Sequence, residues 1–338
     1  MARSPFSGFV IWTIIGLAIF SLAALASGKG AIFNDILQIL LFASMALCYD
    51  YFSGFTGYYN LGFGAFVALG AYVFVISTNH GMNVLASFAL AGVLSALFAA
   101  GVSYPLLRLR GAYFAIATLA LVVLLQIFDT NLFNFTGGTI GLPVDVANGN
   151  YQLPLFVASL GFTIVAIMVH HLIGRSRLGL ALKSIREDED VTESYGVNTF
   201  RTKQIVMVLS GLFAGFSGCL FAVYLQFINS TNILGLGFGL FPVVASIAGG
   251  SGIFLGPVVG SFILSGLNAV VPEIIAAINP TLIFGPLVVS GVILVVVGLF
   301  LPGGILRTRS LSRYAYMRPD RSITNYFTQG RRGIAKAR

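Results

Sequence analysis

The sequence has few charged residues. Asp, Glu, Lys and Arg make up only 9% of its 338 residues, whereas hydrophobic residues make up 57%. A soluble domain carries roughly 25% charged residues, so this chain could not cover a folded surface with polar groups in water. Its mean hydropathy of +0.93 favours lipid as the surrounding medium. The composition therefore excludes an ordinary soluble enzyme and predicts an all-α integral membrane protein.

Groups that could perform chemistry inside the membrane are also scarce. Cys48 and Cys219 lie within apolar runs without metal-ligand spacing, so we interpret them as small buried hydrophobic residues and expect no metal site. An enzyme or a proton-coupled carrier would need ionisable groups in mid-membrane, where each costs about 2.5–3.5 kcal/mol. The ionisable residues near the apolar runs are interpreted as helix-end groups that reach the interface. They are Asp50, His80, Asp129, His170, His171 and Glu273.

A phosphate-binding loop is missing as well. The pattern Gly-x-x-x-x-Gly-Lys-Ser/Thr does not occur, and the glycine-rich run at 249–252 lacks the lysine that would reach the phosphates. We therefore expect no cofactor in this chain. If ATP drives the protein, ATP and Mg²⁺ are bound by another polypeptide.

The apolar runs and the basic residues together predict the topology. Ten runs are long enough to span a bilayer, at 9–27, 35–53, 60–78, 84–106, 111–129, 153–173, 204–226, 236–250, 254–272 and 281–301. With ten spans, 18 of the 19 Lys and Arg residues fall on one side, and only Lys29 falls on the other. Lys and Arg mark cytoplasmic loops, so both termini are expected in the cytoplasm. The first run has spanning length and is expected to be retained rather than cleaved as a signal peptide.

The basic residues also delimit the domains. We expect a transmembrane domain over 1–306 and a basic, flexible cytoplasmic tail over 307–338 that lies against anionic lipid. The net charge of +8 is explained by this topology, because the basic residues lie in loops and in the tail rather than on one folded face. Nucleic-acid binding is therefore not expected.

A short internal repeat occurs at the start of two glycine-rich runs. Leu-Gly-Phe-Gly at 61–64 recurs at 236–239, and in the topology above the two copies run in opposite directions. Inverted repeats of this kind build the central site of many transporters. Chance is the alternative, because 40 glycines and 30 phenylalanines make a four-residue match easy.

The loop between the sixth and seventh runs carries a distinctive charged segment. Leu178, Leu182, Ile185 and Glu189 fall at helical spacing, and Gly196 is placed to follow a helix end. The four consecutive acids at 187–190 contribute little to membrane orientation. A short surface helix that docks a cytoplasmic partner accounts for them, and a solvated loop is the alternative.

Seven segments in register resemble one family. They read GYYNLGFGAFVALGAY at 57–72, RLRGAYFAIATLA at 108–120, TGGTIGL at 136–142, ALKSIREDE at 181–189, SGLFAGFSGCL at 210–220, AGGSGIFLGPVVG at 248–260 and LPGGIL at 301–306. In these segments the chain resembles the permease subunits of ABC importers for branched-chain amino acids, specifically the second of two homologous permeases. Urea and sugar permeases share much of the pattern.

The resemblance implies partners and a location. They are a second homologous permease, two cytoplasmic ATP-binding subunits and an extracytoplasmic substrate-binding protein, assembled at a prokaryotic cytoplasmic (inner) membrane. It also implies that the cytoplasmic loop 174–203 couples the chain to the ATPase. The coupling residues by position are Ser184, Ile185, Arg186, Glu187, Asp188, Glu189 and Gly196.

A translocation pathway of glycine backbone and small polar side chains is expected to carry a zwitterionic aliphatic amino acid. Such a substrate has no net charge, so we expect no fixed counter-charge. The expected pathway residues are Asn60, Gly62, Gly64, Thr136, Gly137, Gly138, Gly249 and Gly250. For each glycine, tight helix packing is the alternative.

Two departures from the family pattern and two rival functions qualify this expectation. The family usually has alanines where 191–194 reads Val-Thr-Glu-Ser, and serine or a similar residue where Asn60 stands. The rivals are a urea, amide or sugar permease of the same family and a secondary carrier that works alone, and a channel-forming or purely structural subunit is a further alternative. A lone carrier would need a mid-membrane carboxylate.

Overall fold

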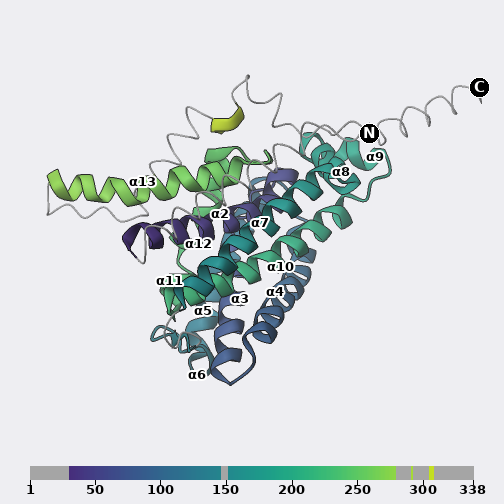
Figure 1. Cartoon of the computed structure of the whole chain (residues 1–338). Coiled ribbons are helices and arrows are strands. Elements are labelled where there is room, and N and C mark those ends of the chain that lie inside the picture. The colour runs from purple at the N-terminus through teal and green to yellow at the C-terminus, as the bar shows by residue number, and fades with distance from the viewer. Residues whose placement is uncertain (1–29, 146–150, 279–290, 292–303, 308–338) are drawn as a thin grey trace, which may run out of the picture.

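Figure 1 shows a computed structural model of the chain, in which residues 30–145, 151–278, 291 and 304–307 are described. Its helices are α2 (Ala31–Thr56), α3 (Phe63–Asn79), α4 (Val84–Leu106), α5 (Ala112–Asn131), α6 (Phe133–Thr136), α7 (Gln152–Arg175), α8 (Arg177–Glu187), α9 (Glu189–Ser194), α10 (Thr199–Leu225), α11 (Ser230–Ile233), α12 (Leu236–Gly249) and α13 (Gly256–Ile278), with a 3₁₀ turn at Ile305–Arg307. Two short strands, β1 (Leu142–Pro143) and β2 (Phe227–Ile228), form an antiparallel pair.

The helices follow the apolar runs of the sequence. Each of the runs between 35 and 272 contains one of α2, α3, α4, α5, α7, α10, α12 and α13. In the described part of the chain, six helical segments are long and apolar enough to cross a membrane, the last being 230–249, whereas α3 has only 17 residues. The run at 9–27, the run at 281–301 apart from Gly291, and the tail beyond 307 lie outside the described residues. The all-α prediction is confirmed, but the expected ten spans are not established.

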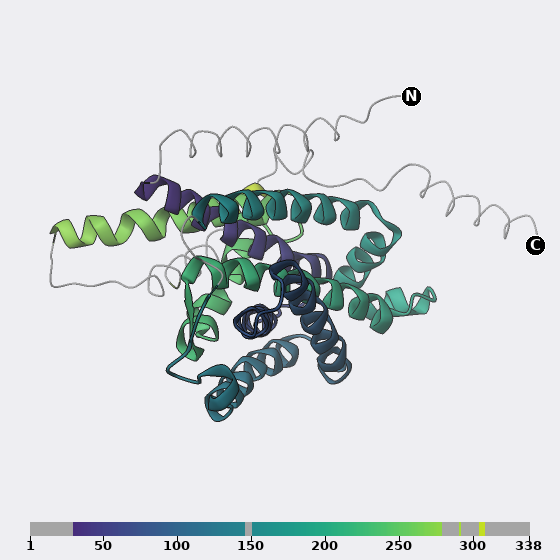
Figure 2. The ribbon, with the colours of Figure 1, turned by 60° about the horizontal axis from the view of Figure 1, so that its bottom comes forward.

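Burial separates central helices from peripheral ones. In α2, 89% of the apolar window is buried, and in α10 the share is 72%. Helices α4 and α5 are as apolar, yet only 28% and 22% of their windows are buried. Helix α10 packs on α2, α3 and α4, while α2 also packs on α7, α12 and α13; Figure 2 shows this bundle from a second direction. The exposed apolar faces of the peripheral helices suit lipid or another membrane subunit.

Glycines allow the closest helix contacts. A Cβ added to Gly64 would lie 2.8 Å from the Cα of Gly239, and one added to Gly70 would lie 2.4 Å from the Cα of Gly215. Small residues permit such approaches where lipid supplies no hydrophobic force between helices. Gly64 and Gly239 are the fourth residues of the two Leu-Gly-Phe-Gly copies, so the copies meet at equivalent positions.

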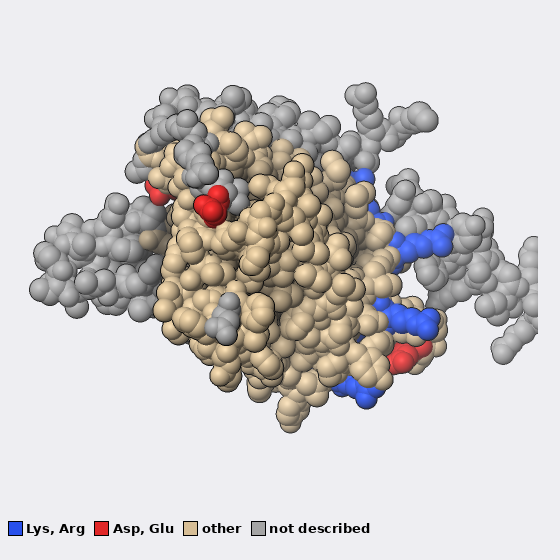
Figure 3. All heavy atoms as spheres, turned by 90° about the horizontal axis from the view of Figure 1, so that it is seen from below, with Lys and Arg blue, Asp and Glu red and all other residues tan. Residues whose placement is uncertain are grey.

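Basic side chains gather at one end of the bundle, which we name the basic end. Figure 3 shows them along one edge of the molecule, beside a broad uncharged surface. The residues concerned are Arg108, Arg110, Arg175, Arg177, Lys183, Arg186, Arg201 and Lys203. Members of this set lie in the turn between α4 and α5, at the carboxyl end of α7, in the α8–α9 segment and at the amino end of α10.

Candidate functional site

The α8–α9 segment at the basic end is two short helices rather than one. Ser176 caps α8 by accepting a hydrogen bond from the Gly179 N–H, and Leu182 and Ile185 are buried. At Asp188 the backbone is extended, and the side chain caps α9 by accepting from the Val191 N–H at 3.0 Å. The expectation that Glu189 continues the first helix is therefore wrong, because a capping Asp interrupts it.

Helix α9 ends where the position of Gly196 in the sequence predicts a helix end. Gly196 follows the C-cap of α9 with φ +81°, and its N–H donates to the Glu193 carbonyl at 2.9 Å. This left-handed backbone favours glycine after a helix end. The predicted position of Gly196 is confirmed.

Glu189 ties the α8–α9 segment to two other parts of the chain. The Lys203 ammonium at the start of α10 donates to Oε1 at 2.6 Å, and the Tyr58 hydroxyl after α2 donates to Oε2 at 2.5 Å. Lys203 is almost fully buried and also lies 4.6 Å from the Tyr58 ring centre. Burial raises the pKa of the Glu189 carboxyl, but the hydrogen bonds from Lys203 and Tyr58 outweigh it and leave the pKa below its usual value.

Arg186 makes a second connection, to the ends of two membrane helices. Its guanidinium donates to the Gly54 carbonyl in the last turn of α2 at 2.7 Å and to the Ser251 carbonyl after α12 at 3.3 Å. By contrast, the Arg110–Asp190 ion pair at 2.7 Å is solvent-exposed, and pairs of that kind contribute under about 1 kcal/mol. The buried Lys203–Glu189 pair and the Arg186 bridge are therefore the contacts that fix α8 and α9 to the bundle.

The expected coupling residues consequently fall into two groups. Ile185, Arg186 and Glu189 point toward the bundle and anchor the segment. The remaining residues are exposed: Ser184, Glu187, Asp188 and Gly196. Arg186 is also exposed although it bridges to the bundle, so the surface that another protein could contact comprises this second group and part of Arg186.

A buried polar cluster lies directly behind this anchor. Asp50 of α2 and His170 of α7 are fully buried, and His170 Nε2 lies 2.9 Å from Asp50 Oδ2. Asp50 also accepts hydrogen bonds from the Ser246 hydroxyl at 2.5 Å, from the Ser251 hydroxyl at 3.2 Å and from the Gly252 N–H at 3.0 Å. The carboxylate thus holds the turn after α12 from inside, while Arg186 holds the Ser251 carbonyl from outside.

This cluster corrects the interpretation of Asp50 and His170 as interfacial helix-end groups. Helix α2 extends past Asp50 to Thr56, so the carboxylate lies within the bundle. Asp129 is also buried, and it accepts a hydrogen bond from the Tyr72 hydroxyl at 2.9 Å. The sequence signal was present, since Asp50 sits between Tyr49 and Tyr51 in an apolar run, but its partner is 120 residues away.

The expected pathway residues near α3 and α12 make packing contacts. Asn60 is buried, and its side chain accepts from the Gly62 N–H at 3.0 Å. A Cβ on Gly62 would lie 2.4 Å from the Thr118 carbonyl, and one on Gly249 would lie 1.6 Å from the Gly256 carbonyl. Gly250 adopts φ +117° in the turn that Asp50 holds. Helix packing and turn geometry account for these residues, and a role in the pathway stays a prediction.

Thr136, Gly137 and Gly138 lie in a turn far from the basic end. The Thr136 hydroxyl donates to the Asp129 carbonyl at 2.9 Å, and both glycines have positive φ, +69° and +54°. A Cβ on Gly141 in the same turn would lie 2.4 Å from the Ile228 carbonyl of β2. The Thr-Gly-Gly-Thr-x-Gly-Leu motif therefore shapes the turn that pairs β1 with β2, and the structure does not bring it together with Gly249 and Gly250.

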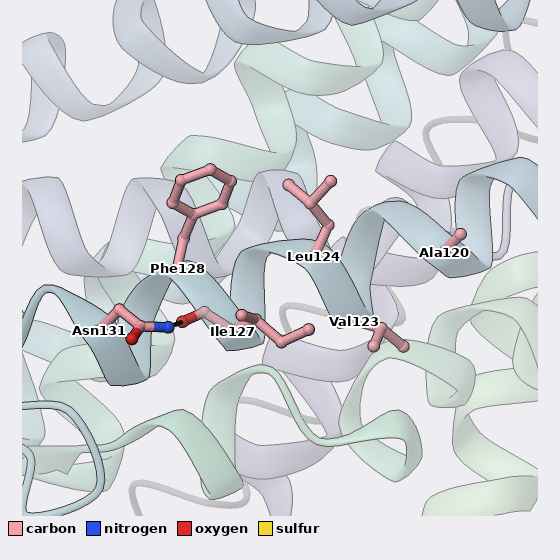
Figure 4. A pocket seen from close by; sticks show the side chains of 6 residues that line it. All are labelled: Ala120, Val123, Leu124, Ile127, Phe128 and Asn131. Carbon is pink, nitrogen blue, oxygen red and sulfur yellow. Dashed lines mark hydrogen bonds between the residues drawn. The ribbon is translucent and has the colours of Figure 1, made fainter.

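The concave surfaces formed by described residues include two of more than 500 Å³. The first, of about 520 Å³, runs along α5, and its six lining residues belong to that one helix, with Leu124 and Phe128 pointing the same way (Figure 4). Its lining is almost wholly apolar, which suits lipid or a second membrane subunit.

The second concave surface is a pocket of about 770 Å³, which we name the α2–α12 pocket. It lies at the end of α2 opposite the basic end and combines aromatic with polar side chains. Its lining residues are Asp35, Gln38, Phe42, Gln126, Thr231, Asn232, Gly235, Leu236, Gly237, Phe238, Phe241, Ser265 and Asn268. None of the eight expected pathway residues belongs to this lining.

Comparison with known proteins identifies the family. Residues 31–298 match the family described as the permease component of branched-chain amino acid transport systems. The high-affinity branched-chain amino acid transport system permease protein LivM of Salmonella typhimurium is 29% identical over 206 residues, which is 52% of this chain and 48% of LivM. The chain thus matches about half the length of that relative.

Two further relatives mark the breadth of the family. The probable branched-chain amino acid transport permease protein LivH of Methanocaldococcus jannaschii is 25% identical over 82% of this chain and 90% of its own length. The ribose import permease protein RbsC of Escherichia coli K12 is 30% identical over 41% of each chain. No solved structure matches. The match over 31–298 covers most of the chain, which therefore is a multi-pass membrane protein and belongs to the permease family of branched-chain amino acid transport systems.

Proposed function

We propose that this chain is the translocation subunit of an ATP-driven importer for aliphatic amino acids. It works beside a second homologous permease, receives substrate from an extracytoplasmic binding protein, and is driven by two cytoplasmic subunits that bind ATP and Mg²⁺. The observation that carries the proposal is the α8–α9 segment, whose acidic outer face is exposed while its inner face is fixed to three parts of the bundle.

The orientation follows from charge. If the basic end faces the cytoplasm, as Lys and Arg excess indicates, α8 and α9 lie where ATP-binding subunits can reach them. The α2–α12 pocket then lies toward the outer face of a prokaryotic inner membrane. The binding protein delivers substrate on that side.

The contacts define how a displacement of α8–α9 reaches the membrane helices. A push on α9 moves Glu189 and with it Lys203 at the start of α10. A push on α8 moves Arg186, which holds the last turn of α2 and the turn after α12. Because packed helices shift between discrete arrangements rather than deform continuously, these attachments allow one docking event to rock α2, α10 and α12 together.

The experiment is uptake of radiolabelled leucine by the complete complex in proteoliposomes, with ATPase activity measured in parallel. We expect Glu187→Gln with Glu193→Gln to lower both rates, because these two acids are exposed and the Glu189 anchor stays intact. The matched control is Asp145→Asn, an exposed acid outside the segment. Wild-type uptake and ATPase stimulation in the double variant would refute the proposed docking surface. Failure of the wild-type complex to take up any aliphatic amino acid would refute the proposed substrate class.

A sugar importer is the second candidate, because RbsC is among the relatives. Competition of leucine uptake by ribose and by urea in the same proteoliposomes separates the two. Leucine uptake that an excess of either leaves unchanged supports the amino-acid assignment, whereas ribose uptake without leucine uptake favours the sugar importer.

A further inference from the structure

We propose that the α2–α12 pocket holds the transported amino acid and that the Asp35 carboxylate is the counter-charge for its ammonium group. This inference rests on the proposed function and adds a binding site to it. The volume of about 770 Å³ lies within the usual range for small-molecule sites, roughly 300–1,000 Å³.

The floor of the pocket is aromatic. Phe42 of α2 stacks on Phe241 of α12 with ring centres 3.8 Å apart, and Phe238 lies 6.4 Å from Phe42. Phe221 of α10 supports this group from behind, at 4.9 Å from both Phe42 and Phe238. Supported rings of this kind keep their positions when the pocket is empty, and they offer an apolar surface for an aliphatic side chain.

The rim of the pocket is polar. Asp35 and Gln38 share the α2 face that carries Phe42, because residues at i, i+3 and i+7 line up along a helix. Asp35 is exposed, and no described residue forms an ion pair with it. Gln126, Thr231 and Asn232 complete the rim with amide and hydroxyl groups that can donate to a carboxylate.

An unsatisfied buried hydroxyl points to a ligand independently. Ser265 is only 8% exposed, its hydroxyl has no hydrogen-bond partner among the described residues, and it lines this pocket. Buried polar groups nearly always find a partner. A polar molecule in the pocket supplies one.

The ligand class follows from the charges. The lining contains one carboxylate and no Lys or Arg. An amino acid presents an ammonium that the carboxylate attracts, a carboxylate that the neutral donors bind, and an apolar side chain that fits the aromatic floor. A sugar or urea has no charge for Asp35 to neutralise. The proposal thus departs from the sequence expectation that a zwitterion needs no fixed counter-charge.

The pocket is connected to the coupling segment through the same two helices. Asp35 lies 15 residues before Asp50 in α2, which is about 22 Å along the axis at 1.5 Å per residue. Phe241 lies one turn and a half before Ser246, whose hydroxyl binds Asp50. Movement of the turn that Arg186 and Asp50 hold is thus transmitted along α12 to the pocket floor.

The test measures ligand protection and transport in the complete complex. Asn232→Cys at the rim is treated with a membrane-impermeant thiol reagent, the two native cysteines being buried. We expect leucine to slow labelling and 4-methylpentanoate, which lacks the ammonium, to do so at least tenfold less effectively. In the same background Asp35→Asn should abolish the difference, and Asp35→Glu should restore it.

In proteoliposomes we expect Asp35→Asn to lower leucine uptake about tenfold while ATPase stimulation by the loaded binding protein persists. Asp145→Asn is the matched control, with the same chemical change at an exposed outer position. Equal protection by leucine and 4-methylpentanoate in the wild type, or wild-type uptake by Asp35→Asn, overturns the site while leaving the proposed function intact. The protection comparison needs no Asp35 variant, so it decides the matter even if Asp35→Asn fails to insert. If the wild-type complex takes up no aliphatic amino acid, the proposed function itself fails.

Discussion

Replacing Asp50 with Asn should strongly destabilise the permease. Asp50 is fully buried and is contacted by His170, Ser246, Ser251 and the Gly252 N–H. Asn retains one acceptor oxygen and places an NH₂ group where donors now point. The Ser246 and Ser251 hydroxyls would have to turn from donating to accepting, and every partner would lose a hydrogen bond to a carboxylate.

The magnitude follows from these contacts. A hydrogen bond to a charged group contributes roughly 1.5–3 kcal/mol, and a buried polar group left without its partner costs about 1–3 kcal/mol. The contacts share one carboxylate and are not additive, so we expect a loss of about 3–5 kcal/mol. That is a large part of the roughly 5–15 kcal/mol that stabilises a typical folded protein.

A reversible unfolding titration of the purified permease in detergent micelles, followed by circular dichroism, measures the loss. Gly54→Ala is an independent route to the same result, because a Cβ on Gly54 would lie 2.3 Å from the Asp50 Cγ and force the carboxylate out. Asp145→Asn, at an exposed position, serves as the control and should change the free energy of unfolding by under about 0.5 kcal/mol. A loss below 1 kcal/mol for both Asp50→Asn and Gly54→Ala would refute the buried cluster.

Two further predictions concern the helix contacts and the coupling segment. Gly64→Ala should lower the free energy of unfolding by about 1–3 kcal/mol through overpacking, because its Cβ would lie 2.8 Å from the Gly239 Cα. Gly239→Ala should be tolerated, because its Cβ would lie at an ordinary 3.5 Å from the Gly64 Cα. Equal effects of the two variants in the same titration would contradict this packing. The lowered pKa of Glu189 means that its stabilising contacts are complete above the unfolded value near 4.5 and are lost as the pH falls through the lower folded value. The difference in unfolding free energy between wild type and Glu189→Gln should therefore be constant from about pH 6 to 8 and shrink below about pH 4.5. A difference that changes between pH 6 and 8 would contradict the role given to the Glu189 carboxylate.

The helices could be predicted from the sequence because their signal is local. Apolar runs of spanning length define them, and the cap at Gly196 follows from glycine's tolerance of positive φ. The sequence alone does not predict the break at Asp188, because the acid run 187–190 also fits one charged helical face. An Asp at the start of a helix can instead cap it.

The sites could be predicted only in part because they depend on distant contacts. The charged segment at 184–189 is visible in the sequence, but the division into anchoring and exposed residues depends on Gly54, Tyr58 and Lys203. Whether a glycine packs or lines a pathway depends on its neighbour in another helix. The α2–α12 pocket takes residues from α2, α5, α11, α12 and α13, and no sequence pattern joins Asp35 to Ser265.

The central claim is that this permease is driven through α8 and α9 from the cytoplasm. Tyr195→Cys tests it most directly, because Tyr195 is 80% exposed at the end of α9 and both native cysteines are buried. An impermeant thiol reagent should label this cysteine in inverted vesicles but not in right-side-out vesicles. Asn232→Cys should give the opposite pattern. Added ATP-binding subunits should block the labelling of Tyr195→Cys. Labelling of Tyr195→Cys from the outer face of right-side-out vesicles would contradict the account.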